Sequence, residues 1–218
     1  AALNDSDNVS AVTFTFSEPV SGFAEGDVTV LGGTLSAFSG SGTSYSATFT
    51  ATDNVEMTGS LSVAAGIYTD AAGNPGAAGS DTVAIDTKNP TVSVSIVDAS
   101  LNDTDNVSNV TFTFSESTAN FVLGDLTVVG GTLSGLSGSG TSYSATFTAT
   151  DGVETAGQVL VKATSYTDAA GNLGEAGWDT VTIDTLNPTV TVAIVDAALN
   201  DSDHVSNVTF TFSETPTG

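Results

Sequence analysis

Apolar and polar residues alternate with a period of two through much of the chain. In Val12–Phe16 (VTFTF), Val and Phe alternate with Thr, and Tyr45–Phe49 (YSATF) alternates Tyr, Ala and Phe with Ser and Thr. The segments Val83–Ile85 and Val92–Ile96 follow the same pattern. Such alternation predicts half-buried strands that carry their β-branched and aromatic side chains on one face. No segment has a helical period, so the pattern predicts an all-β fold.

The alternating segments are separated by runs typical of turns, such as SGSGTS, TDNVEMTG and TDAAGNPGAAGS. The whole arrangement then repeats. LNDSDNVSAVTFTFSE begins at Leu3, and closely similar segments begin at Leu101 and Leu199, an offset of 98 residues each time. A unit of this length matches a small domain. About seven short strands in each unit predict tandem immunoglobulin-like β-sandwich domains.

We divide the chain into repeat 1 (residues 1–86), repeat 2 (87–184) and repeat 3 (185–218). Asn89–Asp98 (NPTVSVSIVD) is interpreted as the first strand of repeat 2. Repeat 1 lacks this strand, and repeat 3 holds only its first two strands. We expect the sequence to be a window on a longer tandem array, with an open sheet edge and an uncovered apolar groove on repeat 1. The alternative is that Thr189–Asp196 completes repeat 1 of a neighbouring chain.

The net charge of the chain excludes some classes of binding partner. It has 25 acidic residues against two lysines and a formal net charge of −23. Such a chain is repelled by phosphate backbones and by anionic membrane surfaces, so we expect no nucleic-acid partner. No apolar run approaches the roughly 20 residues of a spanning helix, so we expect no membrane insertion in this segment. The self-repulsion favours bound cations.

Several motifs in a fixed order carry a resemblance: FSEPVSGF, GDVTVLGGTLS, SGSGTSYSATFTAT, YTDAAGN and DTxNPTV. Together they resemble the bacterial Ig-like repeats of giant secreted adhesins and biofilm-associated proteins, over the whole chain. The resemblance implies extracellular domains at the bacterial cell surface, acting in cell adhesion or biofilm formation, with Ca²⁺ stiffening the stalk. The implied partners are neighbouring repeats of the same chain and, through other regions, a cell-surface glycan or protein.

Threading seven strands through a sandwich brings oxygen ligands from four segments to the end where each domain begins. The set contains no His or Cys, and carboxylate and amide oxygens suit Ca²⁺. A cation would also relieve the repulsion between grouped carboxylates. We therefore predict a Ca²⁺ site there. Its candidates are Asp86, Asn89, Glu116, Asp125, Asp168 and Asn172 at the end where repeat 2 begins, Glu18, Asp27, Asp70 and Asn74 in repeat 1, and Asp184, Asn187 and Glu214 for repeat 3.

Two alternatives remain open at this end. Asp, Asn and Gly are ordinary turn residues, and Asx turns explain the DAAGN loop without any metal. The NDSDN loop at the other end of repeat 1 faces the same junction, where Asp5 and Asp7, with Asp53 and Glu56, would offer a second or shared ion site.

The sequence contains little evidence for catalytic or phosphate-binding motifs, and we expect no catalysis. His204 is the single histidine and replaces Asn8 and Asn106 of the other copies, so we expect a surface substitution. No base accompanies the serines, which argues against a hydrolytic triad. SGSGTS lacks the Lys of a phosphate-binding loop. Trp178 is expected to pack within a loop rather than to stack on a ligand. The leading hypothesis is a structural spacer. The alternatives are a glycan- or protein-binding module that uses Trp178, and a filament subunit whose repeat 1 accepts a strand from another chain.

Overall fold

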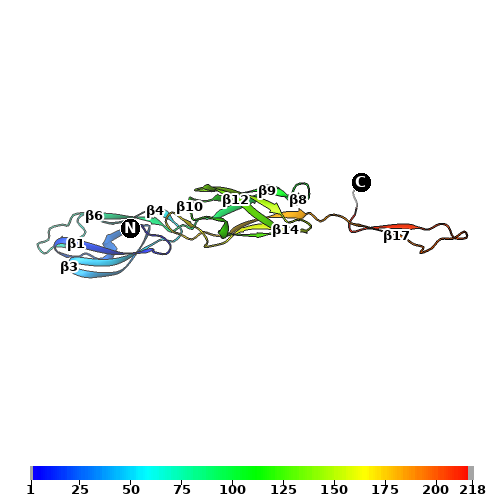
Figure 1. Ribbon diagram of the computed structural model, residues 1–218. Coiled ribbons are helices and arrows are strands. Elements are labelled where there is room, and N and C mark those ends of the chain that lie inside the picture. Colours follow the sequence, from blue (N-terminus) through cyan, green and yellow to red (C-terminus); the bar gives the residue numbers. More distant parts are fainter. Residues whose placement is uncertain (1, 216–218) are drawn as a thin grey trace.

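The computed structural model describes residues 2–215, which form three units in a row (Figure 1). Repeats 1 and 2 are β-sandwiches, and the described part of repeat 3 is a two-stranded hairpin. The only helical segments in residues 2–215 are two three-residue 3₁₀ turns, so the all-β prediction is confirmed. No helix in these residues has the length and apolar character needed to cross a membrane.

Repeat 2 is a complete sandwich of two four-stranded sheets. One sheet has the order β12-β13-β9-β7 and the other the order β11-β14-β16-β8. All neighbours are antiparallel except β8, which runs parallel to β16. The elements are β7 (Val92–Ile96), β8 (Ser100–Asn102), β9 (Val107–Phe114), β10 (Thr118–Ala119), η2 (Leu123–Asp125), β11 (Leu126–Val129), β12 (Gly131–Ser139), β13 (Ser142–Ala149), β14 (Glu154–Val161), β15 (Thr167–Asp168) and β16 (Gly177–Asp184).

The period-two pattern of β9 produces the core of repeat 2. Phe112 and Phe114 are 0% and 4% exposed, whereas Thr111 is half-buried and Thr113 is exposed. The predicted register, with the Phe residues inward, is therefore confirmed. These rings pack edge to face with three further aromatic rings at centroid separations between 4.9 and 5.7 Å. The further rings are Phe121, Tyr143 and Tyr166.

Repeat 1 repeats this plan without the first strand. Its sheets have the orders β3-β1-β5 and β2-β4-β6. The long β3 doubles back on itself and takes the place of both β12 and β13. Its two ends lie side by side: the N–H of Thr52 donates to the carbonyl of Gly32 at 2.9 Å, and a Cβ on Gly33 would lie 2.4 Å from the carbonyl oxygen of Thr50. A parallel bridge from Leu3 to Ile85 matches β8 against β16. The elements are β1 (Val9–Ser21), η1 (Glu25–Asp27), β2 (Val28–Leu31), β3 (Gly33–Ala51), β4 (Glu56–Val63), β5 (Thr69–Asp70) and β6 (Gly79–Asp86).

The open edge that the sequence predicts on repeat 1 is present. In repeat 2, β9 lies between β13 and β7, whereas in residues 2–215 the free side of β1 pairs only with β5, at Val20 and Ser21. Phe14 and Phe16, the counterparts of Phe112 and Phe114, are half-buried. The predicted groove lies along this edge.

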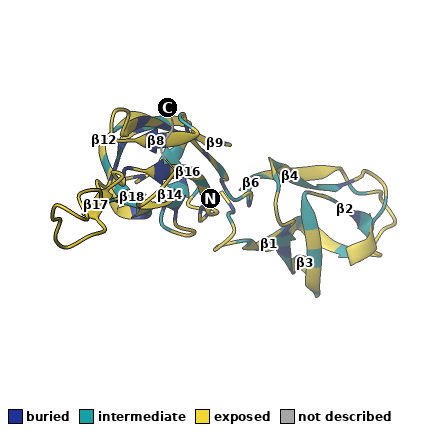
Figure 2. Ribbon diagram, turned by 90° about the vertical axis from the view of Figure 1, so that its right-hand side faces the viewer, coloured by how far each residue is buried: buried dark blue, intermediate teal, exposed yellow. Residues whose placement is uncertain are grey.

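Repeat 3 consists of β17 (Val190–Ile194) paired antiparallel with β18 (Val208–Phe212). Every residue of the two strands is exposed (Figure 2), and the hairpin extends away from repeat 2 (Figure 1).

Candidate metal centre

The linker between repeats 1 and 2 is fixed to repeat 1 by a buried threonine. Thr87 is 2% exposed, and its Oγ1 donates to the carbonyl of Thr52 at 2.8 Å and accepts from the N–H of Val55 at 3.1 Å. Thr185 makes the same bonds to Thr150 and Val153 in the next linker. The sequence analysis missed this role, although the motif that repeats as DTxNPTV contains the signal.

Tyr166 fixes the other side of the linker to repeat 2. Its hydroxyl donates to the carbonyl of Pro90 at 3.1 Å and to that of Glu175 at 2.9 Å. Burial, together with the Glu175 carboxylate, raises the pKa of Tyr166 to about 12, so the phenol stays protonated at neutral pH. The linker is therefore held by both repeats.

The loop that follows Tyr166 has the geometry of an Asx turn. Asp168 Oδ1 accepts from the N–H groups of Gly171 at 2.7 Å and Asn172 at 2.9 Å. Asn172 Nδ2 donates back to Asp168 Oδ2 at 2.7 Å. Gly171 has φ = 95°, a left-handed conformation that favours glycine. Asp70 and Asn74 make the same pair of contacts in repeat 1. Turn chemistry thus explains why Asp and Asn recur in this loop.

A group of three carboxylates forms where the linker meets this loop. Side-chain oxygens of Asp86, Glu116 and Asp168 all lie within 4.8 Å of one another. Asp86 ends β6, Glu116 follows β9, and Asp168 ends β15. Within residues 2–215, this is the one acidic group that meets this distance. The sequence-based threading therefore placed these three side chains together correctly.

The carboxylate group carries uncompensated negative charge. Burial raises the pKa of Asp86 and of Glu116, and the charge of Asp168 raises both further. Glu56 adds to this effect, because it stands directly opposite Asp86 in the β4–β6 ladder. Lys88 lowers both pKa values but does not cancel the rise. The negative charges of Asp168 and Glu56 thus repel those of Asp86 and Glu116, and only Lys88 opposes this effect on their pKa values.

Two oxygen atoms at this junction lack hydrogen-bond donors. Glu116 Oε1 and Asn89 Oδ1 are buried and accept no hydrogen bond from the described residues. A buried polar atom without a partner is costly, and a cation would satisfy it. Carboxylate and amide oxygens are the ligands that Ca²⁺ takes in proteins. Asp86, Glu116, Asp168 and Asn89 therefore fit a Ca²⁺ ion in their chemistry.

Asn172 joins the two repeats beside the carboxylate group and is 1% exposed. Its Nδ2 donates to the carbonyl of Asp86 at 2.8 Å, and its Oδ1 accepts from the N–H of Asp5 at 2.8 Å. A second contact runs from Asn4 Nδ2 to the carbonyl of Ala170 at 2.7 Å. The NDSDN loop therefore faces the junction as expected.

The loop acts through different atoms from those expected. It contributes the N–H of Asp5 and the side chain of Asn4, whereas the carboxylates of Asp5, Asp7 and Asp53 lie outside the three-carboxylate group. Asn4 was missed by the sequence analysis. Its only signal is that Asn occupies this position in all three copies of the motif, as Asn4, Asn102 and Asn200.

Two of the candidates in repeat 2 lie outside the carboxylate group and make hydrogen bonds in this structure. Asp125 lies in η2, where its Oδ2 accepts from the N–H of Val122 at 2.8 Å, and it is not part of the carboxylate group. Asn172 Oδ1 is already bonded to Asp5. Both side chains thus accept a hydrogen bond from a backbone N–H in this structure, and their metal binding stays a prediction.

The candidates of repeats 1 and 3 do not form such a group in residues 2–215. Glu18 is exposed, and Asp27 accepts from the N–H of Ala24 at 2.8 Å. Asp70 and Asn74 remain bonded to each other, and the sequence contains no counterpart of Asp86 for them. In the same way, it contains no counterpart of Asp168 for repeat 3. The repeat 3 candidates, Asp184, Asn187 and Glu214, are all exposed.

Trp178 does not pack in a loop, so that prediction was wrong. It lies in β16 and is 62% exposed. The alternation of β16 explains the outcome: Val181 and Ile183 point inward, which places residue 178 on the outer face. His204 is exposed, as a surface substitution would be.

The two sandwiches define a tandem β-sandwich protein, and comparison with known families identifies its kind. The model of the bacterial Ig-like domain matches residues 1–85 and 86–183, so the chain belongs to this family and the predicted fold class is confirmed.

Two solved structures of bacterial proteins show a distant similarity to the chain. The structure of InvD from Yersinia pseudotuberculosis is 22% identical, with a TM-score of 0.32 over 94% of this chain and 63% of that one. The adhesin InvE from the same organism is 14% identical, with a TM-score of 0.30 over 84% of this chain and 56% of that one. The chain thus spans less than two thirds of either protein. No curated protein matches it.

Proposed function

We propose that the chain is a section of the stalk of a bacterial adhesin, in which Ca²⁺ stiffens the junction between Ig-like repeats. One observation carries the proposal: Asp86, Glu116 and Asp168 come from three separate segments and place their oxygens within 4.8 Å of one another. The buried and unpartnered Glu116 Oε1 supports it. The role is structural and not catalytic.

The proposed ion would act by joining the linker to repeat 2. Asp86 belongs to the last strand of repeat 1, whereas Glu116 and Asp168 belong to repeat 2. An ion held by all three resists bending at the linker, and it neutralises charge that otherwise pushes the two repeats apart. The Asn172 contacts already fix the same place, so the ion would reinforce a preformed junction.

The adhesive role and the location rest on sequence rather than on the solved structures. Membership of the bacterial Ig-like family and the ordered motifs support a surface or secreted protein. The stalk would hold an adhesive region away from the cell, and the partners of this section would be its neighbouring repeats. Adhesion and biofilm formation belong to the whole protein and are part of the proposal.

A calcium titration of matched variants tests the ion. A ligand that binds only the folded state stabilises it by about 2.7 kcal/mol at a hundredfold excess over Kd. We expect millimolar Ca²⁺ to raise the melting temperature of the unmodified chain. It should also straighten the molecule, which small-angle scattering measures as a greater length. Glu116→Gln keeps the shape and removes one charge, so it should lose most of this response. Glu18→Gln, at the matching position of repeat 1, should keep it.

Two outcomes would count against the site. One is an identical melting curve in chelator and in millimolar Ca²⁺. The other is a Ca²⁺ response of Glu116→Gln equal to that of Glu18→Gln, since the ion would then bind elsewhere.

A binding module is the second candidate, and the exposure of Trp178 favours it. An exposed tryptophan ring on a strand offers a flat surface for stacking on a glycan or a protein. Repeat 1 has Ser80 at this position, so Trp178→Ser converts one repeat to the other's surface. Binding of the full chain to a glycan array or to cells, lost in Trp178→Ser, would support this function. No binding by the unmodified chain would reject it.

A further inference from the structure

A groove lies at the junction of the two sandwiches. It encloses about 460 Å³ and is lined by Asp5 and Ser6 of the NDSDN loop, by Asn89 of the linker, and by residues 163–164 and 171–176 of repeat 2. None of the three grouped carboxylates lines this groove. It is therefore a separate surface from the candidate metal centre, although Asn89 belongs to both.

Hydrogen bonds fix the shape of the groove on the repeat 2 side. The N–H of Thr164 donates to the carbonyl of Gly174 at 2.8 Å, and the N–H of Gly174 donates to the carbonyl of Tyr166 at 2.9 Å. A side chain at position 174 would clash with the buried Tyr166 ring. The two loops that line the groove are thus held side by side, which lowers the entropy cost of binding a partner.

Two carboxylates from different repeats line the groove without hydrogen-bond donors. Asp5 and Glu175 are both exposed, and neither carboxylate accepts a hydrogen bond from the described residues. No lining residue carries a positive charge. The net charge of −23 adds a general negative potential to the site. The groove therefore offers acceptors and negative charge, and it favours a ligand that brings donors and positive charge.

The groove contains a residue in a strained backbone conformation. Thr164 has φ = 62°, in the left-handed region that a β-branched residue rarely adopts, whereas its counterpart in repeat 1 is Gly66 with φ = 81°. Strain of this kind costs stability and is concentrated at functional sites. Repeat 2 thus keeps a side chain in the groove at a position where its backbone favours glycine.

Further differences between the two repeats lie in and beside the groove. In each case a small or rigid residue of repeat 1 is replaced by a larger apolar or charged one. Leu160, Leu173, Glu175 and Trp178 of repeat 2 stand where repeat 1 has Ser62, Pro75, Ala77 and Ser80. The replaced positions change the outer surface of repeat 2 and leave the strand pattern intact.

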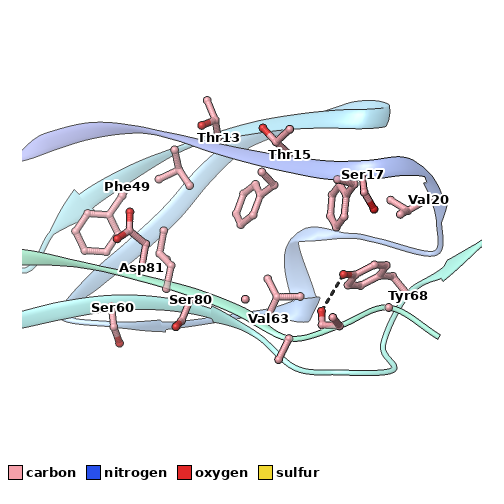
Figure 3. A pocket seen from close by; sticks show the side chains of 18 of the residues that line it. Thr13, Thr15, Ser17, Val20, Phe49, Ser60, Val63, Tyr68, Ser80 and Asp81 are labelled. Atoms are coloured by element: carbon pink, nitrogen blue, oxygen red, sulfur yellow. Dashed lines mark hydrogen bonds between the residues drawn. The ribbon is translucent and has the colours of Figure 1, made fainter.

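Trp178 extends the groove onto the outer face of β16. Gly177 points inward against β7, so Ala176, which lines the groove, and Trp178 share the outer face. Ser80, the counterpart of Trp178, likewise points away from the space between the sheets of repeat 1 (Figure 3). Leu160 stands directly opposite Trp178 in the β14–β16 ladder. An apolar surface therefore borders the acidic groove.

We propose that the groove and this apolar surface form a docking site for a basic protein. A Lys or Arg side chain of the partner enters the groove and donates to the carboxylates of Asp5 and Glu175. A neighbouring apolar residue of the partner packs on Trp178 and Leu160, because tryptophan is enriched among the residues that contribute most to protein interfaces. The charge of the chain attracts such a partner and repels an acidic one.

This inference names the chemistry of the partner for the binding module described above, and it rests on that second candidate function. It does not depend on the Ca²⁺ ion. Since Asp5 belongs to repeat 1 and Glu175 to repeat 2, the partner contacts both repeats at once.

The fluorescence of Trp178 tests the proposal, because it is the only tryptophan in the sequence. The probe is a capped peptide with one Leu beside one Arg in a Gly/Ser frame, titrated into the full chain in chelator. We expect a saturable change with a Kd of about 1 mM that weakens with added salt. A peptide with citrulline in place of Arg keeps the shape and removes the charge, so it should bind at least about fivefold more weakly.

Two matched variants separate the groove from the net charge. Glu175→Gln removes one carboxylate of the groove and should weaken the Arg peptide at least about threefold. Glu154→Gln removes the same charge from the exposed start of β14, at the far end of repeat 2, and should bind the peptide as the unmodified chain does. Both positions are exposed, so both variants should keep the melting temperature of the unmodified chain.

Three results would overturn the proposal. The first is no binding of the Arg peptide up to about 10 mM, and the second is equal binding of the Arg and citrulline peptides. The third is equal binding by Glu175→Gln and Glu154→Gln, since net charge alone would then attract the peptide. If the unmodified chain binds a neutral glycan and not the Arg peptide, the binding module stands and the basic partner is rejected.

Discussion

Repeats 1 and 2 share nearly the same strands, yet they bury them differently. The core of repeat 2 is one cluster of 15 buried apolar residues, whereas repeat 1 has two smaller clusters of four each. Val110, Phe112 and Val181 are at most 2% exposed, and their counterparts in repeat 1 are half-buried. One strand, β7, accounts for the difference. In a thin sandwich, an edge strand of five residues therefore closes the core as well as extending the sheet.

Truncating the same phenylalanine in each repeat should give the largest contrast. Phe114→Ala removes a ring that is 4% exposed and should cost about 3–5 kcal/mol. Phe16→Ala removes a half-buried ring and should cost about 1–2 kcal/mol. Urea unfolding of dilute protein, monitored by hydrogen exchange and mass spectrometry, measures the free energy of unfolding of each repeat separately. Equal costs would mean that β7 does not close the core.

The loop asparagines should give a smaller contrast of the same sign. Asn172→Ala leaves the N–H of Asp5 and the carbonyl of Asp86 without these partners in a partly buried place, which should cost about 1–3 kcal/mol. Asn74 is exposed, and Asn74→Ala should cost less than about 0.5 kcal/mol. The same unfolding experiment measures both. A similar loss in both variants would show that the turn, and not the junction, uses this residue.

The response to pH should be the smallest contrast, and its sign should differ between the carboxylates of the junction and the Asp70 loop of repeat 1. In metal-free protein, the pKa values of Asp86 and Glu116 are raised, first by burial. The folded state then binds protons more tightly than the unfolded state, so stability rises as the pH falls from 7 towards the ordinary values of 3.8 and 4.5 and is lost again as the pH rises.

Repeat 1 has the opposite case. The side chain of Asn74 lowers the pKa of Asp70, so that contribution is present at neutral pH and is lost on acidification. Both effects are small because solvent screens these groups. Unfolding of metal-free protein between pH 7 and about 4.5 measures them. Glu116→Gln should reduce the gain of repeat 2 on acidification, and an unchanged gain would place its source elsewhere.

The sequence predicted the elements that depend on local pattern. The alternation around Phe112 and Phe114 gives the register, and the 98-residue offset gives the domains. Threading those strands was enough to bring Asp86, Glu116 and Asp168 together, because strand direction alone determines at which end of a sandwich a loop lies. Their metal binding stays a prediction.

The contacts that the sequence did not give depend on exact side-chain reach. Asn4 bonds to a loop 166 residues away, and Thr87 bonds to a turn 35 residues before it. The carboxylate of Asp125 accepts a hydrogen bond from the N–H of Val122, three residues before it. None of these choices changes the alternation of apolar and polar residues, and for Asn4 and Thr87 the one signal is that they recur in the other copies of the repeat.

The path of the chain through repeat 2 determines how the domain would carry mechanical load in the proposed stalk. Tension enters through the linker into β7 and leaves through β16 at the opposite end of the sandwich. β7 is then pulled along its own length against β9, and its five register pairs share the force at once instead of opening one by one. The parallel β8–β16 pairing is loaded in the same way behind it. In a stalk of such domains, a pulling force would load the paired strands in shear. Each linker would extend little, because its threonine is hydrogen-bonded to the preceding repeat.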